Sequence, residues 1–186
     1  MGFDEKTKLG IAEGRGGRRG PENVWGSALT GVLCAAAASQ GTAFLGISTT
    51  VWLLAYVASL ATKLADTFAS EIGKAYGKTT FLITSLQPVP RGTEGAISLE
   101  GTIASIVGGL LLSLYAYLVV GLIPSLEGVA VATLAAFVAT MVESLIGATL
   151  QEKEGFDWMS NEVVNFFNTL IGAAIAIGLG VFVLGM

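Results

Sequence analysis

Histidine is absent from this 186-residue sequence, and cysteine occurs once, at Cys34. These absences exclude histidine-based catalysis, histidine metal ligands and an internal disulfide bond. Charged residues are also scarce, at 13% of the chain, whereas an average soluble domain carries about 25%. Because 53% of the residues are hydrophobic and the mean hydropathy is +0.71, the composition predicts an all-α, polytopic membrane protein.

The apolar residues form five segments, which predict a transmembrane bundle of about five helices: 24–39, 43–64, 98–122, 127–150 and 162–185. The first segment is short for a membrane helix, which needs about 20 residues. Very short linkers join segments one and two and segments three and four, so each pair is predicted to form a tight helical hairpin. The chain therefore divides into a polar, basic N-terminal segment, 1–23, and one membrane domain, 24–186.

The polar connections predict an orientation. If all five segments span, residues 1–23, 65–97 and 151–161 share one face of the membrane, and the termini lie on opposite faces. The ten lysines and arginines lie on or beside that face, which the positive-inside rule makes cytoplasmic. Part of this bias follows from the shortness of the opposite loops. The basic run containing Arg15, Arg18 and Arg19 predicts contact with anionic lipid headgroups. No aromatic residues are interleaved with it, so nucleic-acid binding is not expected.

Two short matches are consistent with an internal repeat. Asp66-Thr67 follows segment two, and Glu143-Ser144 lies late in segment four, so each acid–hydroxyl pair belongs to the second half of a predicted hairpin. Repeated halves are common in membrane proteins with a central site. Chance explains matches this short equally well.

The stretch SEIGKAYGKTT, residues 70–80, ends like a phosphate-binding P-loop. Its glycine spacing is one residue short and a long apolar segment precedes it, so a P-loop is not predicted. If residues 62–78 are helical, one stripe carries Asp66, Ser70, Gly73 and Gly77. The adjacent stripe carries Glu71, Lys74 and Lys78. Carboxylates, cations and open backbone suit a phosphate chain with Mg²⁺. The same residues also suit plain helix packing and an exposed ion pair.

Three further sites are candidates. Glu143 lies inside an apolar segment, where an acid usually faces a cavity or a partner. The loop 86–102 carries Arg91, Thr93 and Glu94 among glycines, and Ser98 is predicted to cap the next helix, whose N-terminus could bind an anion. The third site places Asn161, Glu162 and Asn165 at the start of the last apolar segment, where Asn161 is predicted to be a helix cap.

These motifs resemble a known family. Residues 17–28, 65–102, 143–158 and 161–173 are similar to the integral-membrane family that includes phytyl-phosphate kinase of the vitamin E pathway, and the resemblance runs from about residue 8 to the C-terminus. The pattern D-x-x-A-x-x-x-G-x-x-x-G-K at 66–78 also resembles CTP-dependent polyprenol and phytol kinases. Relatives usually carry further N-terminal apolar segments, and often Asn-Asp in place of Asn161-Glu162.

The resemblance implies transfer of a phosphoryl group from a nucleoside triphosphate, CTP first among them, to phytyl phosphate. It implies that Asp66 and Glu143, with Glu71, hold Mg²⁺. The implied phosphate-neutralising residues are Lys74, Lys78 and Arg91. The remaining implied nucleotide- and phosphate-binding residues are Ser70, Gly73, Gly77, Thr93, Glu94, Asn161, Glu162 and Asn165. A phototroph is implied, with a cyanobacterial plasma or thylakoid membrane as the simplest setting.

Three alternatives stay open at the level of sequence. One is a kinase or cytidylyltransferase that acts on another lipid, such as phytol or a polyprenol. Another is a catalytically silent fragment, since relatives usually carry further N-terminal apolar segments. The third is a small ion-coupled transporter in which Asp66 and Glu143 carry ions. The transporter explains paired intramembrane acids, but it leaves Lys74, Lys78 and the loop 86–102 without a role.

Overall fold

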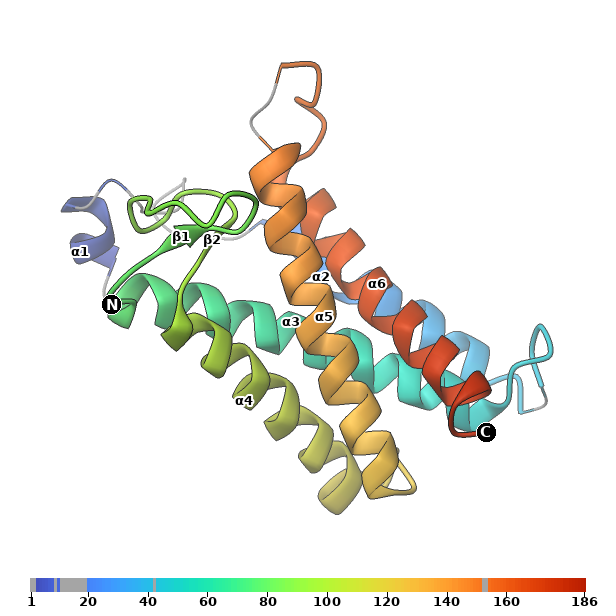
Figure 1. Ribbon diagram of the computed structural model, residues 1–186. Coiled ribbons are helices and arrows are strands. Elements are labelled where there is room, and N and C mark those ends of the chain that lie inside the picture. The colour runs from blue at the N-terminus through green and yellow to red at the C-terminus, as the bar shows by residue number, and fades with distance from the viewer. Residues whose placement is uncertain (1–2, 9, 11–19, 42, 152–153) are drawn as a thin grey trace.

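The computed structural model describes residues 3–8, 10, 20–41, 43–151 and 154–186 (Figure 1). A short helix, α1 (Phe3–Lys8), precedes the long helices of the molecule. These are α2 (Pro21–Ala38), α3 (Thr49–Tyr76), α4 (Leu99–Tyr115), α5 (Leu126–Thr149) and α6 (Asn161–Phe182). A π-helical turn, η2 (Ala116–Val120), continues α4, and two short strands, β1 (Phe81–Leu82) and β2 (Ala96–Ile97), pair antiparallel.

The prediction of a helical membrane protein is confirmed. Within the described residues, four helical stretches are long and apolar enough to cross a membrane: α3, α4 continued by η2, α5 and α6. The remaining long helix, α2, corresponds to the first apolar segment, which is short for a span. Exposed apolar side chains follow the outer face of α4 at helical spacing, including Leu99, Ile103, Ile106 and Leu110. Such a stripe suits contact with lipid tails.

Helix α3 is the centre of the bundle. It contacts α2, α4, α5 and α6, and in Figure 1 it runs across the molecule between them. Its residues Leu54, Val57 and Ala58 are buried against Ala132 of α5 and Ala176 of α6. Small side chains at these positions let the helix backbones approach closely, which is how membrane helices gain packing energy. The helix extends to Tyr76, so most of the predicted helical stretch 62–78 is confirmed, and Gly77 terminates it.

Serine residues begin the long helices after α2. The hydroxyl groups of Ser48, Ser98, Ser125 and Ser160 each accept a hydrogen bond from the backbone N–H three residues later. This satisfies an N–H group that the first turn of a helix leaves unpaired. The prediction for Ser98 is confirmed. The prediction that Asn161 caps the last helix is wrong, because Ser160 takes that role and Asn161 is the first helical residue.

The predicted tight hairpin at residues 40–42 is also wrong. Helix α2 ends at Ala38 and α3 begins at Thr49, so residues 43–48 belong to the connection. The reason is local: Gly46 has φ +75° and Leu45 has φ +55°, which breaks a helix, while Ser48 caps α3. The indole N–H of Trp52 donates to the carbonyl of Phe44 at 3.2 Å, which holds the connection against α3. The second predicted hairpin, between η2 and α5, is confirmed as a short link.

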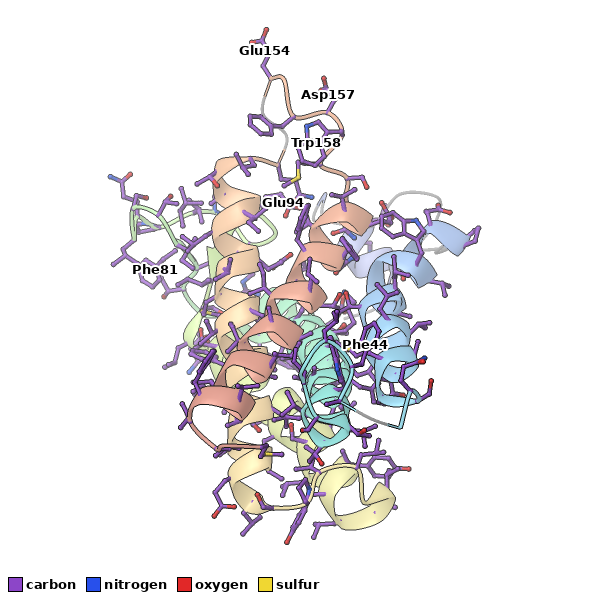
Figure 2. All side chains as sticks on the ribbon, turned by 90° about the vertical axis from the view of Figure 1, so that its right-hand side faces the viewer. Phe44, Phe81, Glu94, Glu154, Asp157 and Trp158 are labelled. Atoms are coloured by element: carbon purple, nitrogen blue, oxygen red, sulfur yellow. The ribbon has the colours of Figure 1, made fainter. Side chains whose placement is uncertain are left out.

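The chain reverses direction at each long helix. Helices α2, α4 and α6 begin where α3 and α5 end, and this end of the bundle also carries β1, β2 and the loop residues 154–160 that precede α6. Figure 2 shows that loop with Glu154, Asp157 and Trp158 beyond the helix ends, and Glu94 at the same end of the molecule. The polar connections of the described chain therefore meet at one end, as the sequence predicts.

Candidate functional site

A cavity of about 620 Å³ opens among the helices at this polar end. Its walls come from the N-terminal turns of α2, α4 and α6, the second half of α3, the last turns of α5 and the loop 92–98. This volume is within the usual range for small-molecule sites, about 300–1,000 Å³. Its lining is unusual for a membrane protein interior because much of it is polar or charged.

The cavity brings together residues that are far apart in the sequence. Eleven of the fourteen predicted site residues line it: Asp66, Ser70, Glu71, Gly73, Lys74, Thr93, Glu94, Glu143, Asn161, Glu162 and Asn165. The other three, Gly77, Lys78 and Arg91, are not part of the lining. Gly77 is buried against Ser98, whereas Lys78 and Arg91 are exposed. The predicted lipid-contact residues Arg15, Arg18 and Arg19 lie outside the described part of the chain.

A lysine that the sequence motifs do not single out lies at the centre of the site. The Lys63 ammonium group donates to Asp66 Oδ2 at 2.8 Å and to Asn165 Oδ1 at 2.5 Å. These contacts join α3 to α6 within the cavity wall. The side chains of Lys63 and Asp66 are 19% and 13% exposed. The sequence signal for this lysine is its spacing, three residues before Asp66 and inside an apolar segment.

Glu143 adds a further charged group to the cavity from a third helix, α5. It is partly buried, lines the same cavity, and lies within electrostatic range of Asp66, Lys63, Lys74 and Glu94. The two acids of the possible repeat, Asp66 and Glu143, therefore face one space. Acids inside membrane helices are costly unless they face a cavity or a partner, and Glu143 faces this cavity.

Close backbone packing forms the wall between α3 and α4. A Cβ atom at Gly73 would lie 3.3 Å from Ser98 Oγ, and a Cβ atom at Gly101 would lie 2.8 Å from the carbonyl oxygen of Ala69. Gly73 therefore serves helix packing, as the alternative interpretation of the Gly73–Gly77 spacing expects, and Gly101 packs against α3 from the facing helix. Gly73 also faces the cavity, so the two interpretations hold together at that position.

The loop after β1 closes the cavity between α4 and α5. Gly95 has φ +74° and lies against Ser144 and Ala148 of α5; a Cβ atom there would come within 2.6 Å of the Ser144 carbonyl oxygen. This contact holds Thr93 and Glu94 at the cavity. The N-terminal turn of α4, through Ser98, Gly101 and Thr102, also lines it. Helix N-termini favour anions because their N–H groups point outward.

The acidic groups of the cavity suit a divalent cation that arrives with a phosphate chain. Across the described residues, no group of three or more acidic or cysteine side chains is close enough to form a metal cage of its own. Mg²⁺ usually binds through one or two carboxylates plus phosphate oxygens and waters. Asp66 and Glu143 supply such a pair, so the residues present fit a metal shared with a bound phosphate.

These features define a class: a helical integral membrane protein with a charged cavity at one end of its bundle. Comparison with known proteins gives the family. The chain belongs to the family of integral membrane protein DUF92, whose model matches residues 1–173.

Three relatives illustrate the relationship. The chain is 61% identical over 180 residues to the membrane protein sll0875 of Synechocystis sp., covering 96% of this chain and 67% of that protein. It is 44% identical over 183 residues to Protein VTE6, chloroplastic, of Arabidopsis thaliana, covering 97% of this chain and 53% of that protein. It is 35% identical over 125 residues to the membrane protein MJ0933 of Methanocaldococcus jannaschii, covering 67% of this chain and 50% of that protein.

The chain thus spans about half the length of the plant and archaeal relatives. No solved structure matches it. The family that the sequence motifs indicate is confirmed by these matches.

Proposed function

We propose that this protein transfers a phosphoryl group from a nucleoside triphosphate to phytyl phosphate, giving phytyl diphosphate for tocopherol and phylloquinone synthesis. One observation carries the proposal: Asp66, Glu143, Lys63 and Lys74 converge on one cavity at the end of a membrane helix bundle. The similarity to VTE6 and the resemblance to the phytyl-phosphate kinase family support it. CTP is the donor that the signature at 66–78 favours.

The transfer needs positioning and charge neutralisation rather than a strong base. An oxygen of the acceptor phosphate is already ionised and attacks the γ-phosphorus, while the bond to the β–γ bridging oxygen breaks and a nucleoside diphosphate leaves. In such a loose transition state the protein's task is to align the reactants and stabilise the oxygens. The absence of histidine is consistent with this chemistry.

The carboxylates have the role of holding Mg²⁺. Asp66 and Glu143 are the primary ligands in this proposal, and Glu71, which lies further along α3 in the same lining, is a third acid. When bound there, the metal would neutralise part of the charge of the donor phosphates.

The cations and polar residues have the role of holding phosphates and nucleotide. Lys74 lines the cavity and is in electrostatic range of Glu143, so it serves the transferred phosphoryl group. Lys78 and Arg91 lie outside the lining, so we assign them to the outer part of the nucleotide. The remaining lining residues around the nucleotide are Ser70, Gly73, Thr93, Glu94, Asn161, Glu162 and Asn165.

The phytyl chain has the bilayer as its solvent. A 20-carbon isoprenoid needs only an apolar surface, and the exposed leucine and isoleucine stripe of α4 begins beside the cavity wall. In this proposal the polar end faces the cytoplasm, where nucleotides are found, in a cyanobacterial plasma or thylakoid membrane. Identity of 61% to the Synechocystis protein supports the cyanobacterial setting.

The test is a reaction with purified protein in liposomes containing Mg²⁺, phytyl phosphate and each of the four nucleoside triphosphates in turn, with products identified by mass spectrometry. Phytyl diphosphate is expected, with CTP the best donor. Because the longer relatives extend beyond this chain, the same assay is run on a chimera that carries the additional segment of the Arabidopsis relative. Absence of phytyl diphosphate from both folded proteins would overturn the proposal.

Two additions to this experiment separate the alternatives: parallel reactions with free phytol in place of phytyl phosphate, and a measurement of ion flux into the liposomes. Phytyl phosphate formed from free phytol would identify an alcohol kinase, which needs a base for the hydroxyl proton. A cytidylyl product would identify a cytidylyltransferase. Ion flux into the liposomes without nucleotide consumption would identify a transporter.

A further inference from the structure

Lys63 is a residue to which neither the motifs nor the family resemblance assigns a role. It lies midway along α3, and its ammonium group contacts the carboxylate of Asp66 and the amide oxygen of Asn165. The Asp66 contact spans three residues of one helix, and the Asn165 contact joins two helices. The ammonium group therefore sits between the two walls of the cavity, directly on the carboxylate proposed to hold the metal.

Electrostatics explains why a cation is needed there. Asp66 and Glu143 line one cavity within electrostatic range of each other, and like charges repel strongly where water is scarce. A buried charge must be paired to be tolerated. The Lys63 ammonium group lies 2.8 Å from Asp66 Oδ2 and so supplies a positive charge at this carboxylate. Lys63 is therefore placed to compensate the charge of Asp66, as a bound divalent cation would.

We propose that Lys63 is an internal counter-ion, whose ammonium group pairs with Asp66 where a divalent cation would bind. When a phosphate chain enters, the ammonium group moves to the phosphate oxygens. Asp66 then binds the cation that arrives with the phosphates. The inference rests on the proposed function for the identity of that phosphate as part of a nucleotide. Lysine suits the role because its ammonium group is a compact charge on a flexible four-carbon stem.

The exchange makes metal binding conditional. A divalent cation that entered alone would have to displace an ammonium group that then has no new anion to contact, and the two cations would repel each other. A cation that enters with phosphates brings the anion that Lys63 needs. A free metal ion therefore binds weakly in this cavity, whereas a metal–nucleotide complex binds well. The metal is bound at Asp66 only when the phosphoryl donor is present.

The counter-ion role is tested by the binding of Mn²⁺, used alone as a paramagnetic probe for the Mg²⁺ position, to purified protein without nucleotide or lipid substrate. Lys63→Met is expected to bind Mn²⁺ about 10- to 100-fold more tightly than the unchanged protein, the range by which neighbours of metal ligands alter affinity. Lys63→Arg keeps the charge and is expected to bind as weakly as the unchanged protein. Lys63→Met combined with Asp66→Asn should lose the gain.

Lys74→Met is the matched control, because Lys74 lines the same cavity and carries the same charge, whereas the ion pair of Asp66 is made with Lys63. The Mn²⁺ affinity of Lys74→Met should rise by less than about threefold, because this substitution removes a nearby positive charge but breaks no ion pair with Asp66. An equal gain in both methionine variants, or none in Lys63→Met, would overturn the proposal. If Lys63→Met does not fold, Lys63→Gln, which keeps an amide for Asn165, must show the gain.

These measurements use no phosphoryl transfer. The assay with phytyl phosphate can fail while the difference in Mn²⁺ affinity between Lys63→Met and Lys74→Met persists. Phytyl diphosphate can also form while the two variants show no difference in Mn²⁺ affinity. The failure of the counter-ion inference and the failure of the proposed reaction are therefore told apart by separate readouts.

Discussion

Gly101 of α4 faces the backbone carbonyl of Ala69 in α3, and a Cβ atom on Gly101 would lie only 2.8 Å from that oxygen. Both residues also line the cavity. The absence of a side chain at Gly101 therefore sets the distance between α3 and α4, and it also sets the shape of this cavity wall. Gly108, two turns further along α4, continues the close contact against Leu64 and Phe68.

Replacing Gly101 with alanine is expected to destabilise the protein by about 1–3 kcal/mol, because the obstructing atom belongs to a backbone and cannot turn aside. The measurement is thermal unfolding in detergent, followed by helical circular dichroism. Gly178→Ala is the matched control: Gly178 lies inside α6, and a Cβ atom there would meet no atom of the described chain within 4 Å. There alanine should stabilise the helix by about 0.5–1 kcal/mol. Equal shifts in the two variants would contradict the close-contact explanation.

Asp66→Asn tests the carboxylate at the centre of the site. Removal of its charge takes away the proposed metal ligand and leaves the Lys63 ammonium group without its ion pair. The rate of phytyl diphosphate formation is expected to fall by at least about 100-fold, as when one group that stabilises the transition state is lost. Helical content should be retained. Glu127→Gln, which removes an acid at the opposite end of the bundle, should keep its activity; turnover in Asp66→Asn that equals this control would remove Asp66 from the mechanism.

Lys74 and Lys78 are four residues apart, yet the fold gives them different surroundings. Lys74 lines the cavity, and Lys78 is exposed beyond the end of α3. Lys74→Met is therefore expected to lower kcat by about 100-fold, whereas Lys78→Met should act mainly on the KM for nucleotide, by less than about tenfold, because exposed charges are screened. Steady-state kinetics with varied CTP checks both. Equal losses in kcat would place the two lysines at the same phosphate.

The sequence predicts the structure best where a local pattern of residues favours a single conformation. Apolar length predicts the helices, and the 3.6-residue period places Asp66, Ser70, Glu71 and Lys74 on neighbouring faces that do line one cavity. The serine before α4 is identifiable as a cap from its residue type alone. These features depend on neighbours within about one or two helical turns, which are visible in the chain.

The rest depends on contacts between distant segments. The partner that gives Lys63 its position is Asn165, which is 102 residues away. The exposure of Lys78 and Arg91 follows from where α3 ends and how the following loop folds back, and neither is encoded in the motif spacing. Apolar residues in the connection 43–48 favour a helix by composition, whereas the backbone at Leu45 and Gly46 turns left-handed.

The last prediction concerns a buried amide in α6. Asn168 of α6 has no exposed surface, and neither polar atom of its side chain has a hydrogen-bond partner among the described residues. Burying an amide without a partner is costly, and an apolar residue of similar shape removes that cost. Asn168→Leu is therefore expected to stabilise the protein by about 1–2 kcal/mol, measured as a higher melting temperature in detergent.

The neighbouring residue provides the comparison. Thr169 is equally buried, but its hydroxyl group donates to Thr30 Oγ1 at 3.0 Å. Thr169→Val removes that bond between α6 and α2 and should cost about 1 kcal/mol. Opposite signs for the two substitutions would show that satisfied and unsatisfied polar groups coexist one residue apart in α6. A melting temperature that falls in Asn168→Leu as far as in Thr169→Val would mean that a bound water satisfies the amide.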